Sequence, residues 1–146
     1  MKISMACDHG AFEYKELIKK MLSDEGHEVV DYGCHSKESM DYPDTAALAA
    51  KAVANKECER GIVICSTGIG VSIVANKVDG VRCALVHDLA TAKLTREHND
   101  TNVLALGQLT TGELIAKEIV KIWLNTPFSN EPRHQRRIDK VMALEN

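Results

Sequence analysis

The sequence predicts an α/β protein: a three-layer, doubly wound, Rossmann-like domain with a five-stranded parallel sheet and an additional C-terminal helix. Two observations carry this prediction. Apolar segments of strand length alternate along the chain with longer segments of helical periodicity. The strand segments are apolar throughout, which is typical of parallel strands covered by helices on both faces. No linker or internal repeat divides the 146 residues, so a single domain over 1–146 is expected.

The first half of the chain alternates three expected strands with two helices. A helix over 11–25 precedes Gly26, because glycine commonly follows the end of a helix. Another helix runs from Pro43 to about residue 56, since proline suits the first helical position. The strands are expected at residues 3–6, 28–32 and 61–65.

The second half continues the alternation and predicts the topology. The expected elements are a short helix to residue 77, a strand over 81–86, a helix over 89–98, a strand over 102–106, a helix over 111–125 and, after Pro127, a helix over 133–144. By analogy with flavodoxin-like folds, the predicted strand order is 2-1-3-4-5. In that order the winding reverses between the first and third strands, and ligands bind beyond the carboxyl ends of those strands.

Composition excludes several classes of function. The net charge of -3 argues against a dedicated nucleic-acid binder. No apolar segment approaches the roughly 20 residues that span a bilayer, and the N-terminus enters a strand pattern without a signal peptide, so a cytoplasmic protein without a membrane partner is expected. Five cysteines, an odd number without a Cys-x-x-Cys pair, indicate reduced thiols rather than disulfides or a zinc site.

Two loops are expected to meet where the winding reverses. Cys7-Asp8-His9-Gly10 follows the first strand, and Cys65-Ser66-Thr67-Gly68-Ile69-Gly70 follows the third. The second loop can bring backbone N–H groups close to an anion; the alternative is a pair of tight turns without a ligand. The glycines lack the third member of a dinucleotide fingerprint, and no Walker Gly-Lys-Ser/Thr occurs. Neither NAD nor ATP is expected as a cofactor.

Cys65 is the candidate for acid–base chemistry. It is the last residue of its expected strand and lies beside a helix N-terminus, which stabilises a thiolate. A thiolate there can act as a base or as a nucleophile. The alternative is a buried core cysteine, which is the usual place of this residue type.

His98 is a second candidate, at the end of the helix over 89–98. A histidine at a helix C-terminus can simply complement the helix dipole. That helix returns from the carboxyl edge of the sheet to the amino edge, and a five-residue strand spans about 17 Å. His98 therefore cannot easily join Cys65 within one chain. If both are catalytic, a homodimer with shared active sites follows.

The only basic cluster lies at the start of the last helix. Arg133 and Arg137 are one helical turn apart, so both can face one anion, and two guanidinium groups suit a phosphate dianion. The alternative is a solvated helix face, because Glu131 and Asp139 lie close in the sequence.

Several motifs together resemble a known family. These are Asp8-His9-Gly10, Asp41-Tyr42-Pro43-Asp44, Gly61-Ile62-Val63-Ile64-Cys65, Thr67-Gly68-Ile69-Gly70, Ala75-Asn76-Lys77, Arg96-Glu97-His98-Asn99-Asp100 and Arg133-His134. In order and spacing they are similar to the type B ribose-5-phosphate isomerases, whose wider family includes galactose-6-phosphate and allose-6-phosphate isomerases. The resemblance covers nearly the whole chain and leaves the roles of Tyr42, His87 and His134 open.

The resemblance implies an aldose–ketose isomerase with a cysteine base. Cys65 would move a proton between C1 and C2 of the sugar, and His98 would assist ring opening. The family needs neither a metal nor an organic cofactor and works as dimers or dimers of dimers. The remaining implied roles are an anion hole for the enediolate from Ser66, Gly68, Ile69 and Gly70 with the Thr67 hydroxyl, sugar binding by Asp8, His9 and Asn99, and phosphate binding by Arg133 and Arg137.

The chain departs from the family pattern at two positions that bear on the substrate. Ser66 follows the cysteine where relatives usually have glycine, and Leu109 stands where relatives often have a phosphate-binding arginine. Ribose 5-phosphate is the expected substrate, with allose 6-phosphate, galactose 6-phosphate or a tetrose phosphate as alternatives. A non-catalytic sugar-phosphate binding module and a flavodoxin-like electron carrier are the competing functions. Neither needs Cys65 and His98 together.

Overall fold

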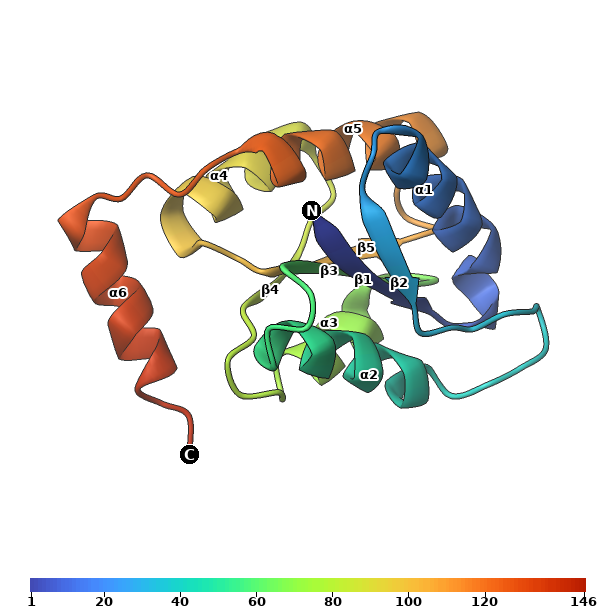
Figure 1. Ribbon diagram of the computed structural model, residues 1–146, viewed down its shortest axis with the longest axis horizontal. Helices are drawn as coiled ribbons and strands as arrows, with labels where there is room; N and C mark the ends of the chain where they lie inside the picture. The colour runs from blue at the N-terminus through green and yellow to red at the C-terminus, as the bar shows by residue number, and fades with distance from the viewer.

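A parallel five-stranded sheet forms the centre of the computed structural model, which describes all 146 residues (Figure 1). Every strand pair is parallel, as predicted. The strands are β1 (Lys2–Cys7), β2 (Glu28–Asp31), β3 (Arg60–Cys65), β4 (Cys83–Leu85) and β5 (Val103–Gly107). The helices are α1 (Phe12–Asp24), α2 (Tyr42–Ala54), α3 (Ile69–Ala75), α4 (Leu89–Asn99), α5 (Glu113–Asn125) and α6 (Pro132–Met142), and a single 3-10 turn spans His9–Ala11.

Helices cover both faces of the sheet, which confirms the doubly wound α/β prediction. Helices α1, α4 and α5 pack on one face, and α2 and α3 pack on the other (Figure 1). Alternate strand residues enter the two resulting cores, because successive side chains of a strand point to opposite faces. Helix α6 stands apart from the other helices, next to the end of α4 (Figure 1).

The strand order differs from the predicted 2-1-3-4-5. The observed order is β2-β1-β3-β5-β4, so β5 inserts between β3 and β4. All five residues of β5 are buried, whereas the three residues of β4 are only partly buried. The fully apolar strand therefore takes the central place, and the short strand beside Arg82 becomes the edge.

The observed strand order places α4 on a different face of the sheet from the one that the predicted order implies. Because parallel crossovers are right-handed, the step back from β4 to β5 places α4 on the face opposite to α3, beside α1 and α5. The reversal between β1 and β3 is unchanged by this correction. The carboxyl ends of these two strands remain adjacent, as the sequence predicts.

A buried ion pair fastens α1 to the end of β2. The Lys15 ammonium is fully buried and lies 2.8 Å from a carboxylate oxygen of Asp31, and it also donates to the Cys34 carbonyl. Burial alone would raise the pKa of Asp31, but hydrogen bonds from Lys15, the Gly33 N–H and Lys19 outweigh it and lower that pKa. The pair holds the loop after β2 against the end of β1, next to Asp8.

Replacing Lys15 by methionine is expected to destabilise the fold by about 3 kcal/mol, because it leaves a largely buried carboxylate without its main partner. The matched variant Lys19→Met removes a cation that is 37% exposed and should cost less than about 1 kcal/mol. Because the pKa of Asp31 is lowered in the fold, the stabilisation is present above about pH 3.8 and is lost as the pH falls through the lowered value. Urea unfolding at several pH values measures both effects. Equal losses for the two variants would contradict this account.

Candidate active site

Cys65 ends β3 at the point where the winding of the sheet reverses. This residue is 5% exposed and lies among the residues that α2 and α3 cover. The backbone N–H of Gly68 donates to the Cys65 sulfur at 3.1 Å, so the turn after the strand folds back over this atom. A donor aimed at sulfur stabilises the thiolate relative to the thiol.

The turn after Cys65 presents backbone donors that the chain does not use. The N–H groups of Ser66, Thr67 and Gly70 make no hydrogen bond within the protein. Thr67 accepts a hydrogen bond from the Ile69 N–H at 3.2 Å through its hydroxyl oxygen. Unpaired N–H groups beside a thiol can bind an oxyanion that develops next to it.

Two glycines allow this turn to form. Gly68 has φ +77°, and a Cβ there would come within 2.8 Å of the Leu106 carbonyl carbon. A Cβ on Gly107 would come within 2.5 Å of the Thr67 carbonyl carbon. Backbone atoms cannot move aside cheaply, so both positions require glycine for the turn to pack on the end of β5.

The loop after β1 reaches the same place. The Asp8 carboxylate accepts the Gly10 N–H at 3.0 Å, and a Cβ on Gly10 would lie 2.6 Å from the Ser66 hydroxyl, so the two loops are in contact. His9 accepts the Met40 N–H at Nδ1. Because Nδ1 is an acceptor, a neutral His9 carries its proton on Nε2 and offers it as a donor.

Tyr42 closes one side of this cluster, and sequence reasoning assigned it no role. A Cβ on Gly70 would come within 2.6 Å of the Tyr42 ring, so the ring packs directly on the first turn of α3. Ile69, beside it, is exposed. The glycine at position 70, inside a helix, is the sequence signal for this close contact.

The loop after β5 is hydrogen-bonded to the Cys65 turn and holds it in place. The Gln108 N–H donates to the Cys65 carbonyl at 3.0 Å, and the Leu109 N–H donates to the Ser66 carbonyl at 2.8 Å. Leu109 is 78% exposed, so it contributes nothing to the core. His87, after β4, is likewise exposed.

Three other cysteines are poorly suited to acid–base chemistry. Burial raises the pKa of Cys7, Cys58 and Cys83, and for Cys83 it does so to about 12. For Cys7, the neighbouring Cys34 thiol at 3.6 Å adds to the effect of burial. These thiols stay protonated at neutral pH, whereas a general base must be deprotonated to accept a proton.

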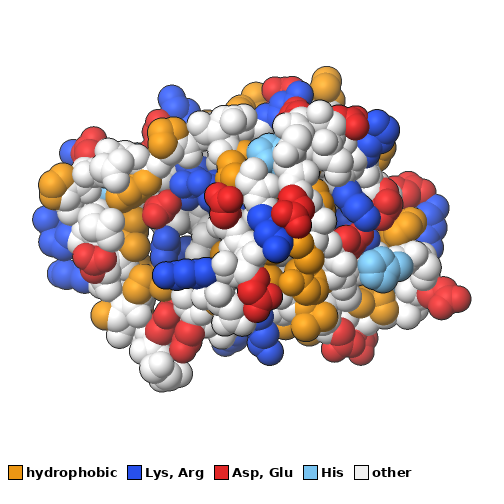
Figure 2. Space-filling model, viewed as in Figure 1, with side chains coloured by type: hydrophobic (Ala, Val, Ile, Leu, Met, Phe, Trp, Pro, Cys, Tyr) orange, Lys and Arg blue, Asp and Glu red, His pale blue; other side chains and the backbone are white.

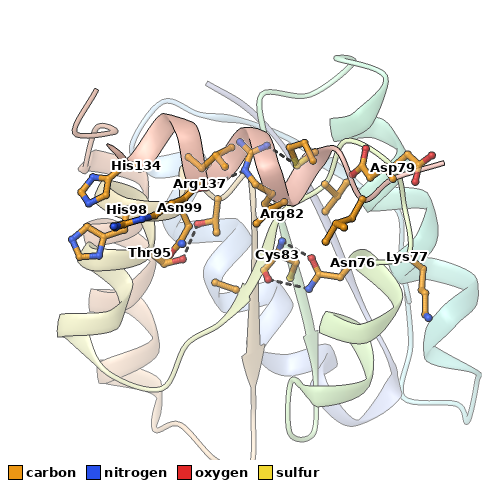
Figure 3. A pocket seen from close by; sticks show the side chains of 18 of the residues that line it. Asn76, Lys77, Asp79, Arg82, Cys83, Thr95, His98, Asn99, His134 and Arg137 are labelled. Carbon is orange, nitrogen blue, oxygen red and sulfur yellow. Dashed lines mark hydrogen bonds between the residues drawn. The ribbon is translucent and has the colours of Figure 1, made fainter. Parts of the chain in front are cut away.

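A second cluster lies at a cleft of about 1040 Å³ between α6 and the body of the protein (Figures 2 and 3). The predicted residues His98, Asn99, Arg133 and Arg137 all line it. In Figure 3, His98, Asn99 and Arg137 gather at one end of the cleft with His134. The structure therefore brings together the implied ring-opening and phosphate-binding residues.

The polar groups of this cluster are largely available to a ligand. His98 and Asn99 are exposed at the end of α4, and the Asn99 carbonyl accepts a hydrogen bond from Arg82 at 3.0 Å. Arg133 pairs with Glu131 at 2.8 Å, and both side chains are exposed. Arg137 forms no ion pair. A phosphate would thus meet one unpaired guanidinium and one weakly held one.

Within one chain the two clusters lie at opposite edges of the sheet. Cys65 is at the carboxyl end of β3, whereas the Gly61 N–H at its amino end donates to the Asn102 carbonyl, just beyond α4. A six-residue strand spans about 20 Å. His98 therefore does not join Cys65 in the monomer, as the direction of its helix predicts.

Two further observations concern metal ligands and membrane-spanning helices. No group of three or more His, Cys, Asp or Glu side chains is placed to hold a metal ion. No helix is long and apolar enough to cross a membrane.

Known proteins resemble this chain over almost its whole length. A sequence profile described as Ribose/Galactose Isomerase matches residues 3–141. Ribose-5-phosphate isomerase B of Escherichia coli (strain K12) is 44% identical over 144 residues, which cover 99% of this chain and 96% of that protein. D-erythrulose-4-phosphate isomerase of Pectobacterium atrosepticum is 40% identical over 129 residues, which cover 88% of this chain and 85% of that protein.

The fold agrees with these sequence matches. The solved structure of ribose-5-phosphate isomerase B from Clostridium thermocellum has a TM-score of 0.96 and 46% identity, and the match covers 99% of this chain and 97% of that one. The family resemblance that the motifs indicate is confirmed. The chain is a member of the ribose/galactose isomerase family, a family of aldose–ketose isomerases.

Proposed function

We propose that this protein interconverts an aldose phosphate and a ketose phosphate, most favourably ribose 5-phosphate and ribulose 5-phosphate, through an enediolate. The observation that carries the proposal is the placement of the Cys65 thiol beside the unpaired N–H groups of Ser66, Thr67 and Gly70. A proton next to a carbonyl is weakly acidic, so its removal needs both a base and a site that binds the developing oxyanion.

In this mechanism the Cys65 thiolate removes a proton from one carbon and returns it to its neighbour. The substrate oxygens that become negative face the N–H groups of the turn, with the Thr67 hydroxyl beside them. Asp8 and the Nε2–H of His9 hold the sugar hydroxyls next to this turn. No step requires a metal or an organic cofactor.

The complete site requires a second subunit. Ring opening needs an acid–base group, and the phosphate needs cations, yet His98, Arg133 and Arg137 lie at the other edge of the sheet from Cys65. A homodimer, or a dimer of dimers, in which the cleft beside α6 of one subunit faces the Cys65 turn of its partner would unite the two halves. A two-fold axis then generates two equal sites.

The substrate preference depends on Ser66. The Ser66 side chain occupies the contact between the two loops, in the space next to the Cys65 turn. This extra bulk, compared with glycine, favours a smaller sugar. One relative, 40% identical to this chain, is named as an isomerase of a tetrulose phosphate. A tetrose phosphate is therefore the second candidate, ahead of allose 6-phosphate and galactose 6-phosphate.

Aldose–ketose conversion on a panel of sugar phosphates tests the proposal. We expect turnover of ribose 5-phosphate, with a tetrose phosphate as the next best substrate and the hexose 6-phosphates at least about tenfold slower in kcat/KM. Substituting Ser66→Gly should reduce the difference in kcat/KM between pentose and hexose phosphates. Binding of these compounds without turnover or solvent proton exchange would instead identify a non-catalytic binding module.

A further inference from the structure

A second histidine lies directly against His98. His134 is the third residue of α6, and its side chain is buried, with 7% of the residue exposed. The centroids of the His134 and His98 rings are 4.5 Å apart, with the ring planes tilted by 40° (Figure 3). An exposed histidine at a helix end is normally free to turn, so this packed partner restricts the His98 ring.

The His134 ring is itself held by a hydrogen bond. Its Nδ1 lies 2.7 Å from the Ser129 hydroxyl oxygen, which also accepts the Glu131 N–H at 3.2 Å. The Ser129 N–H in turn donates to the Glu97 carbonyl, next to His98 on α4. Ser129, His134 and His98 thus form one connected unit between the loop before α6 and the end of α4.

The surroundings of His134 favour its neutral form. Burial lowers the pKa of His134, and His98 together with Arg133 and Arg137 lowers it further, while Glu131 opposes them. The Ser129 hydroxyl can donate its proton to Nδ1 while its oxygen accepts the Glu131 N–H. A neutral His134 of this tautomer carries its proton on Nε2.

We infer that His134, fixed by Ser129, is a positioning residue that orients the His98 ring for sugar-ring opening without adding a positive charge beside it. This inference rests on the proposed function, in which His98 is the acid of that step. In ring opening, the C1–O4 bond of the cyclic sugar breaks, O4 takes a proton from His98, and the C1 hydroxyl gives its proton to a water molecule as C1 becomes the aldehyde carbon. A charged neighbour would disfavour the protonated His98 that this step consumes.

Opening of the sugar ring and proton transfer at C1 are two steps that can be measured separately. Ribose 5-phosphate is a cyclic hemiacetal and must be opened. Ribulose 5-phosphate is an open chain, because the oxygen on C5 that would close its furanose ring carries the phosphate. Exchange of the C1 hydrogen of ribulose 5-phosphate with solvent deuterium therefore needs the Cys65 base alone, whereas conversion that starts from the cyclic ribose 5-phosphate also uses His98.

The experiment compares two rates by NMR in deuterated water: exchange of the C1 hydrogen of ribulose 5-phosphate, and conversion of ribose 5-phosphate to ribulose 5-phosphate. For His134→Ala we expect net conversion to fall about tenfold, as part of the roughly 10²- to 10⁴-fold effect of general acid–base catalysis, with C1 exchange unchanged within about twofold. His134→Phe keeps the ring packing and removes the hydrogen bond, and Ser129→Ala removes only the hydroxyl. Both should lower conversion by about threefold and spare exchange.

Gln135→Ala provides the control, because this exposed neighbour of His134 bonds only Asp139 and should leave both rates unchanged. Equal loss of exchange and conversion in the His134 and Ser129 variants, or no loss of either, would overturn the inference. A wild-type protein that performs no exchange on any sugar phosphate would instead defeat the proposed function itself.

Discussion

Cys65→Ala is expected to abolish both aldose–ketose conversion and C1 hydrogen exchange while the protein remains folded. The thiol ends β3 directly beside the unpaired N–H groups, where a base can remove a carbon-bound proton next to the developing oxyanion. General-base catalysis contributes about 10² to 10⁴ in rate, so a loss of at least about 100-fold is expected for both reactions. Cys65→Ser should fall equally far, because a hydroxyl is a much weaker acid than a thiol and supplies almost no anion at neutral pH.

Cys58→Ala is the matched control for this experiment. Cys58 is also buried and belongs to the same core, but it precedes β3 and lies at the opposite edge of the sheet from Cys65. Its removal should lower stability slightly and change turnover by less than about twofold. Circular dichroism and the thermal midpoint establish that each variant is folded. Conversion by Cys65→Ala at a rate near wild type would exclude the cysteine-base mechanism.

Mixing two inactive variants is expected to restore activity. Cys65→Ala lacks the base and His98→Ala lacks the ring-opening acid, so each homodimer should convert ribose 5-phosphate at a small fraction of the wild-type rate. In a mixed dimer with shared sites, one site carries both defects and the other carries none. Random pairing makes half of the dimers mixed, so the restored activity should approach about one quarter of wild type.

The same experiment distinguishes shared sites from sites within one chain. If each site used Cys65 and His98 of a single subunit, every site in the mixed dimer would keep one defect and no activity would return. Co-expression with two affinity tags isolates the mixed species, and Cys65→Ala paired with Cys65→Ala under the second tag is the control. Absence of restored activity in purified mixed dimers would contradict the two-subunit site.

Much of the fold is predictable from the chain because its signals are local. Apolar runs and helical periodicity predict each strand and helix within a few residues of where the structure has it. Gly26, at φ +89°, follows α1, and Pro43 lies in the first turn of α2, as their conformational preferences predict. The loops at residues 7–10 and 65–70 meet because parallel strands place their carboxyl ends at one edge.

The strand order illustrates a property that local signals do not contain. Residues 81–86 and 102–106 look equally suited to a strand, and only the depth of burial in the finished sheet decides that β5 is central and β4 is the edge. In the sequence, only the charged Arg82 and the short apolar segment after it indicate that this strand lies at the edge. Competition between two strands for one central place depends on every element that covers the sheet.

The candidate site divides in the same way. Sequence alone determined the residue types and their edges of the sheet: Cys65 after a strand, and His98 at the end of a helix that runs back across it. Only the tertiary structure decided which side chains touch, such as Tyr42 on Gly70 and His134 on His98. The physical reason is range: periodicity and capping are set by residues a few positions apart, whereas these contacts join elements distant in the chain that meet only when the whole core packs.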